Sequence, residues 1–155
     1  MTLDEYLKIG ETITLGSHLF TADEIKAFAE KYDPQRFHMD EREAEASVFG
    51  RLCASGWHTC AMWMRYNLAK REDALGKWAG DGPTPTFGPS PGFQNLKWLK
   101  PVYAGEAITF TRRAKAHRPV ASRPGWHVMT LDCEAFDSAG DKVLEFESAV
   151  LLKAG

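Results

Sequence analysis

The stretch WHTCAMWMRYNLAKRE, Trp57 to Glu72, constrains the fold more than any other part of the sequence. Its first two turns leave no clean polar stripe, because they contain Trp57, Cys60, Ala61, Met62, Trp63 and Met64. A helix that is apolar nearly all round must be buried on most of its sides. Charged residues return only from Arg65 onward. We therefore expect a central helix that is held by a sheet and emerges into solvent at its C-terminal end.

The second half of the chain has the alternation of β-strands that such a sheet needs. Ile108 and Phe110 face away from Thr109 and Thr111, and the same period of two continues through two later segments: Met129, Leu131, Cys133 and Ala135, then Leu144, Phe146, Ser148 and Val150. Turn sequences at 122–125 and 137–141 separate these strands, which favours an antiparallel meander. An opening strand is expected at 11–20. The pattern predicts an α+β domain, a curved antiparallel sheet wrapped around the long central helix.

The segment between the opening strand and the central helix is expected to be helical. Thr21 and Glu24 have the spacing of a capping box, in which each side chain accepts a hydrogen bond from a backbone N–H. Pro34 should end this first helix. A shorter helix is expected from Asp40, again capped, towards Phe49 and Gly50. Residues 78–92 are too rich in Gly and Pro for regular structure and predict a long loop.

Composition and charge narrow the possible functions. At 155 residues, the chain is expected to form a single domain, residues 1–155. The net charge of −2, with no basic block, argues against nucleic-acid binding. Cys53, Cys60 and Cys133 are odd in number and form no C-x-x-C, so we expect reduced thiols in a cytoplasmic protein. No signal peptide or membrane-spanning run is visible.

Four stretches in order resemble the MaoC-like dehydratase family, which includes the (R)-specific enoyl-CoA hydratases and has the hotdog fold. They are DPQRFHMD at 33–40, ASVFG at 46–50, ASGWHT at 54–59, and NLKWLKPV at 95–102 followed by YAGE. The resemblance runs from about Phe20 to the C-terminus. The family motif typically reads Asp-x-Asn-Pro-x-His. This chain keeps the acid-to-histidine spacing but has Pro34, Gln35 and Arg36 between them, and Ser55-Gly56 where hydratases commonly have His-Gly.

The resemblance implies hydration or dehydration of an acyl thioester carried by coenzyme A, within fatty acid metabolism. It also implies a homodimer or a dimer of dimers, since one curved sheet leaves a long edge that a second subunit can extend. Neither a metal nor a cofactor is expected beyond the coenzyme A of the substrate. The alternatives are a hotdog acyl-CoA thioesterase and a non-catalytic acyl-thioester binding domain.

Asp33 and His38 are the candidate acid/base pair. A carboxylate and an imidazole that hold one water between them can deprotonate it for attack on the β-carbon and then protonate the α-carbon. Two side chains five positions apart would diverge on a continuous helix. The break at Pro34 lets the side chains of Asp33 and His38 converge. The C-terminal end of the first helix should make the Asp33 carboxylate more basic. The structural alternatives are a helix-terminating turn at Asp33 and a structural His38.

Gly56 is the candidate for stabilising the thioester oxygen. If Ser55 caps the central helix, the first N–H groups of that helix have no backbone partner and can polarise a carbonyl. Glycine allows the thioester to approach the backbone closely, and the resemblance implies this role for the family's glycine. Ser55 and Trp57 are candidate substrate-binding residues. The alternatives are that Ser55-Gly56 is a plain helix start and that Trp57 is a core residue, together with Trp63 and Met64.

Other candidates carry less weight. His58 is expected to pack or to hydrogen-bond within the first turn of the central helix. Cys53 with His58 matches a thiol–imidazole dyad only in spacing, and no ligand pair has the spacing usual for a metal site. Arg118 and Arg123 lie on a strand-connecting loop, where solvation is the simpler interpretation and contact with the phosphates of coenzyme A the alternative.

Overall fold

The computed structural model describes residues 1–155, and five of its six strands follow the last helix. The helices are α1 Leu3–Leu7, α2 Ala22–Tyr32, α3 Arg36–Met39, α4 Glu41–Glu45 and α5 Gly56–Ala69. The strands are β1 Thr12–Leu19, β2 Thr86–Phe87, β3 Gly92–Trp98, β4 Ala107–Pro119, β5 Trp126–Phe136 and β6 Lys142–Lys153. The chain is therefore α+β, as predicted.

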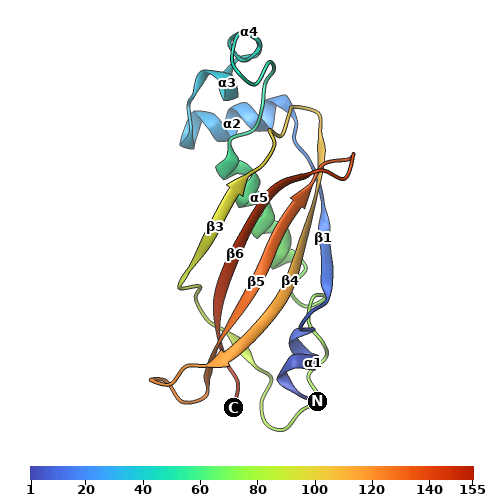
Figure 1. Cartoon of the computed structure of the whole chain (residues 1–155), viewed down its shortest axis with the longest axis vertical. Helices are drawn as coiled ribbons and strands as arrows, with labels where there is room; N and C mark the ends of the chain where they lie inside the picture. Colours follow the sequence, from blue (N-terminus) through green and yellow to red (C-terminus); the bar gives the residue numbers. More distant parts are fainter.

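All strands belong to one antiparallel sheet, in the order β1-β4-β5-β6, with both β2 and β3 paired to β6. The three long strands β4, β5 and β6 form the expected meander, and the sheet curls around α5 (Figure 1). Helices α2, α3 and α4 gather at the end of the sheet where α5 begins. The prediction of a curved sheet wrapped around a long helix is confirmed.

The core lies between α5 and the concave face of the sheet. Trp63 is fully buried there, and its indole Nε1 donates to the Thr111 carbonyl at 2.9 Å. The face of α5 turned away from the sheet is open: Trp57, Met64 and Leu68 are 50%, 42% and 51% exposed. The expectation that α5 is buried on most sides is therefore wrong for this face, because α2 packs only near the first turns of α5.

The N-terminus of α2 forms only half of the predicted capping box. Thr21 Oγ1 accepts a hydrogen bond from the Glu24 N–H at 3.2 Å, as expected. The Glu24 carboxylate does not return to the Thr21 backbone. Its Oε1 instead contacts His18 Nε2 at 2.7 Å and His58 Nε2 at 3.2 Å. Two imidazoles brought in by β1 and α5 thus compete successfully for the carboxylate that the local sequence assigns to the cap.

The segment after α2 is more broken than its sequence indicates. α2 ends at Tyr32, in agreement with the stop expected at Pro34, and a short helix, α3, begins after three further residues. Asp40 caps α4, where its Oδ1 accepts from the Glu43 N–H at 2.9 Å. This helix ends at Glu45, several residues before the expected end near Phe49 and Gly50.

The Gly- and Pro-rich segment 78–92 forms a long loop as predicted, apart from the two-residue strand β2 and Gly92, the first residue of β3. No helix in the chain has both the length and the apolar character needed to span a bilayer.

Candidate active site

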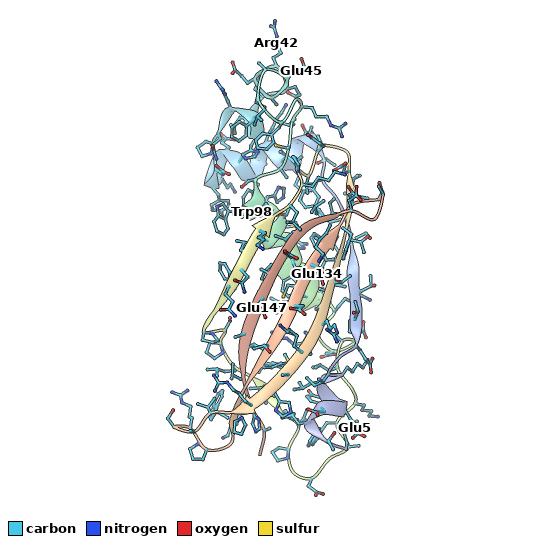
Figure 2. All side chains as sticks on the ribbon, viewed as in Figure 1. Glu5, Arg42, Glu45, Trp98, Glu134 and Glu147 are labelled. Carbon is cyan, nitrogen blue, oxygen red and sulfur yellow. The ribbon has the colours of Figure 1, made fainter.

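A cavity of about 360 Å³ lies at the N-terminal end of α5. Asp33, His38, Gly56 and Trp57, four of the residues singled out from the sequence, all line it. Trp98 lines it as well, from the end of β3, and Figure 2 shows this side chain beside the start of α5. Residues that are far apart in the sequence therefore meet at one hollow.

The break after α2 places Asp33 at the cavity. Asp33 is the C-cap residue of α2, and its side chain is 16% exposed. Its Oδ1 accepts a hydrogen bond from Gln35 Nε2 at 2.7 Å, and its Oδ2 accepts one from Ser55 Oγ at 2.7 Å. Asp33 ends α2, as the structural alternative stated, and it also lines the cavity. The same break in the helix produces both results.

His38 faces Asp33 from the short helix α3. Its Nε2 lies 3.5 Å from Asp33 Oδ2, and its side chain is 7% exposed. Its Nδ1 lies 2.6 Å from the carbonyl oxygen of Cys53. Because a carbonyl oxygen can only accept, Nδ1 must carry a hydrogen there. In the neutral imidazole, this leaves the lone pair on Nε2, which is the nitrogen that points towards Asp33.

The charge state of Asp33 differs from the sequence-based expectation. Burial acts to raise the pKa of the Asp33 carboxyl, but the hydrogen bonds from Gln35 and Ser55 and the neighbouring His38 outweigh burial, so the net shift is downward. The expectation that the end of α2 makes this carboxylate more basic is therefore wrong. Asp33 is an ionised acceptor at neutral pH.

Ser55 joins the carboxylate to the first turn of α5. It is fully buried and is the N-cap of the helix, where its Oγ accepts from the Trp57 N–H at 3.3 Å and donates to Asp33. The N–H of Gly56, one residue further on, donates to no acceptor within the chain. The start of α5 therefore presents an unpaired amide hydrogen beside a carboxylate and an imidazole.

Trp98 explains why position 56 has no side chain. A Cβ on Gly56 would come within 2.3 Å of the Trp98 indole ring. Trp57 meets the same indole edge to face, with ring centroids 5.0 Å apart. Trp98 thus covers the first turn of α5. In this chain, the missing side chain at Gly56 makes room for the Trp98 indole.

The less favoured candidates are separated by the fold. His58 points away from the cavity, stacks on Phe28 with centroids 4.5 Å apart, and contacts Glu24. Burial lowers the pKa of His58, although Glu24 opposes this shift. Cys53 lies near His38, with Sγ 3.7 Å from Nδ1, and burial raises the pKa of its thiol to about 11. No Cys53–His58 dyad forms, and no group of three or more His, Cys, Asp or Glu side chains is arranged to hold a metal ion.

Arg118 lies in β4 and not on the expected loop, whereas Arg123 lies in the loop between β4 and β5. This end of the sheet is opposite the end where α5 begins (Figure 1). Arg123 packs over the Trp126 ring, 5.6 Å from its centroid. Neither side chain lines the cavity of its own chain.

Three contributors to the site were not recognised in the sequence. Gln35 interrupts the family motif, and its amide holds Asp33. The Cys53 carbonyl orients His38, which no side-chain pattern can signal. Trp98 belongs to one of the stretches that carry the family resemblance, but its contact with Gly56 spans 42 positions and could not be predicted from spacing.

Comparisons with known proteins agree with this fold. No protein-family model matches the chain. A crystal structure of the MaoC-like dehydratase from Rhodospirillum rubrum is 30% identical, covers 97% of each chain and superposes with a TM-score of 0.79. The uncharacterized protein YdeM of Bacillus subtilis is 28% identical over 153 residues, 99% of each chain. The (R)-hydratase from A. caviae involved in PHA biosynthesis shares the fold, with 23% identity, coverage of 95% and 96%, and a TM-score of 0.65.

The lowered pKa of Asp33 predicts how stability depends on pH. The unfolded carboxyl titrates near pH 3.9, so ionisation of Asp33 stabilises the fold above that value, and the contribution disappears as pH falls through the lower folded value. Wild type should therefore be more stable than Asp33→Asn at about pH 7, and this difference should shrink below about pH 4. Urea denaturation at several pH values measures it.

Asp81→Asn is the matched control, because Asp81 is exposed and makes no ion pair or side-chain hydrogen bond. Its stability relative to wild type should not change with pH over the same range. A gap between wild type and Asp33→Asn that stays constant down to about pH 3 contradicts the assignment.

Proposed function

Because the chain belongs to the MaoC-like dehydratase family, we propose that it adds water reversibly to a 2-enoyl thioester and so forms a 3-hydroxyacyl thioester. The carrier is coenzyme A, which takes part only as a portion of the substrate. The observation that carries the proposal is the meeting of Asp33, His38 and the unpaired Gly56 N–H at one cavity.

The acid/base step follows from the different protonation states of Asp33 and His38. The ionised Asp33 accepts a hydrogen bond from the water and orients it. His38 Nε2 takes a proton from that water while the oxygen bonds to the β-carbon. The same proton, carried on Nε2, then passes to the α-carbon, so that the elements of water are added and no charge is left over. Cys53 holds the ring in the tautomer that this step needs.

The carbonyl oxygen gains negative charge while the β-carbon is attacked. The Gly56 N–H donates to this oxygen from the start of α5, where the partial positive charge of the helix also favours an anion. Trp57 and Trp98 are apolar neighbours of that amide. Partial exclusion of water by the two indoles strengthens the hydrogen bond to the developing enolate.

We also propose that the chain forms a homodimer through β3. This strand lies at an edge of the sheet and exposes Phe93 by 58% and Trp98 by 46%. The open apolar face of α5 lies next to it, and an uncovered apolar edge of this kind favours association. Phe93→Lys should shift sedimentation equilibrium towards monomer. Leu19→Lys, at the exposed end of β1 on the opposite edge, should leave the mass unchanged.

The assignment of Asp33 and His38 is tested on a panel of enoyl-CoA thioesters. Asp33→Asn and His38→Gln should each lower kcat by about 10²- to 10⁴-fold, the usual contribution of a positioned acid or base. His127→Gln, at the other end of the sheet, should match wild type. Loss of the enoyl chromophore is followed together with free thiol.

The same assay separates the alternatives. Release of thiol without hydration indicates a thioesterase, and tight binding of every thioester without turnover indicates a binding domain. Turnover by both variants at the wild-type rate overturns the acid/base assignment.

The role of the Gly56 N–H can be tested without disturbing the helix. Gly56 is the first residue of α5, a position where proline is well tolerated, and Ser55 already has the extended ψ of 138° that a following proline requires. Trp98→Ala makes room for a side chain at position 56. Gly56→Pro in that background should lower kcat about 10²- to 10³-fold relative to Gly56→Ala in the same background.

The two double variants both carry a Cβ and differ chiefly in the N–H. Circular dichroism should show that both retain the helix. Equal kcat values for the two would show that this amide does not stabilise the transition state.

A further inference from the structure

A second cavity of about 160 Å³ lies further along α5, between its C-terminal half and the concave face of the sheet. Trp63, Met64 and Asn67 form its wall on the helix side. It shares no lining residue with the candidate active site. From Gly56 to Asn67 the helix rises by roughly 16 Å, so the two cavities are separate places on one helix.

Arg112 lines this second cavity from β4. The alternation of that strand turns Ile108, Phe110, Arg112 and Ala114 towards the core, and Arg112 is only 3% exposed. Its Nη1 donates to Asn67 Oδ1 at 3.2 Å. Its Nη2 is buried and donates to no acceptor in the chain. An arginine thus occupies a core position and leaves one arm of its guanidinium unused.

No side chain supplies a negative charge to Arg112. The acidic residues of β5 and β6 alternate to the other face of the sheet, where Glu134 and Glu147 pair with Lys142 and Lys115. Figure 2 shows these two glutamates on the face turned away from α5. Cys133 stands directly across from Arg112, but burial raises the pKa of its thiol, which stays neutral.

The remaining charge near Arg112 makes the imbalance worse. Arg71 also lines the cavity, and it lies 5.2 Å from the centroid of the Phe87 ring. Burial lowers the pKa of Arg112, Cys133 acts in the opposite direction, and Arg71 lowers it further. A buried cation without a partner is strongly unfavourable, and the guanidinium fork matches the two oxygens of a carboxylate.

The size and lining of the cavity limit what it can hold. An apolar cavity of about 150 Å³ takes up benzene, so this one has room for roughly that much ligand. Met129, Leu131 and Val150 line the same cavity and suit a short aliphatic chain. A carboxylate on such a chain satisfies both the charge and the apolar walls.

We propose that this second cavity binds the carboxylate of a short aliphatic acid, with Arg112 pairing with the carboxylate and Asn67 holding the guanidinium in place. The carboxylate has two sources: a free dicarboxylate such as succinate, whose second carboxylate pairs with Arg71 on the lining of the same cavity, or the far end of a dicarboxylic acyl group on a thioester. In the second case, one acyl chain extends from the first cavity to the second, a distance of roughly 16 Å along α5. Binding does not depend on the proposed hydration activity.

The binding test uses succinate and its neutral diamide, succinamide, at equal ionic strength. In isothermal titration calorimetry, wild type should bind succinate and not succinamide. Arg112→Met should weaken the binding of succinate at least about tenfold, the loss expected of a charge-assisted hydrogen bond. Arg113→Met is the matched control, since Arg113 is the next residue on the exposed face of β4, and it should bind as wild type does.

Asn67→Asp is a second test variant, in which the new side chain has the same shape as the original one. Its result does not depend on whether Arg112→Met folds. It places a carboxylate 3.2 Å from Arg112 Nη1, where the amide oxygen now lies. If Arg112 lacks a counter-charge, Asn67→Asp should raise the melting temperature without ligand and weaken the binding of succinate at least about tenfold. A lower melting temperature together with unchanged binding overturns the proposal.

A third arm identifies the source of the carboxylate. Saturated acyl-CoA thioesters with a terminal carboxylate are compared with neutral thioesters of the same length. A preference for the carboxylate that Arg112→Met abolishes assigns the cavity to the substrate's acyl end, whereas binding of succinate without this preference assigns it to a separate acid. If wild type binds neither carboxylate more tightly than its neutral analogue, the proposal is wrong. Only binding is measured, so a chain without hydratase activity still gives a result.

Discussion

The hydrogen bond from Ser55 to Asp33 ties together the two parts of the chain that form the candidate active site. Ser55 caps α5 and so fixes where the first free amide of that helix points. The same hydroxyl donates to the carboxylate at the end of α2. One buried side chain therefore sets the position of the carboxylate relative to the amide, and it also favours the ionised state of the carboxylate. His38 joins this arrangement through the backbone of Cys53, two residues before Ser55.

Much of the architecture could be predicted because it depends on local chemistry. Alternation along β4, β5 and β6 defines the sheet, Thr21 and Asp40 mark helix starts, and Pro34 marks the break that brings Asp33 towards His38. Asp33 and His38 could be paired because they are five positions apart, whereas Gly56, which lines the same cavity, was indicated by the expected start of α5 and by the family resemblance. What could not be predicted depends on contacts between distant segments. Part of the downward shift in the pKa of Asp33 comes from Ser55, 22 positions away, although the hydrogen bond from the nearby Gln35 contributes more.

Glu24 illustrates how tertiary contacts override a local motif. Its spacing from Thr21 is that of a reciprocal cap, but one oxygen of its carboxylate serves His18 and His58 instead. The contact ties α2 to both β1 and α5 beside the candidate active site. Arg112 is a similar case, since the alternation that places Ile108 and Phe110 inside places this arginine inside as well. Pattern alone locates such a residue, and only its surroundings reveal whether its charge is matched.

The position of Trp98 connects β3, the exposed edge of the sheet, with the candidate active site. This indole ends β3, the strand with free backbone groups, and it also roofs the first turn of α5. A second chain that pairs with β3 would contact Trp98 and would either move this side chain or fix its position over the first turn of α5. In the proposed dimer, assembly and the shape of the candidate active-site cavity are coupled through this side chain, so dilution of the protein should alter the proposed activity even when every subunit remains folded.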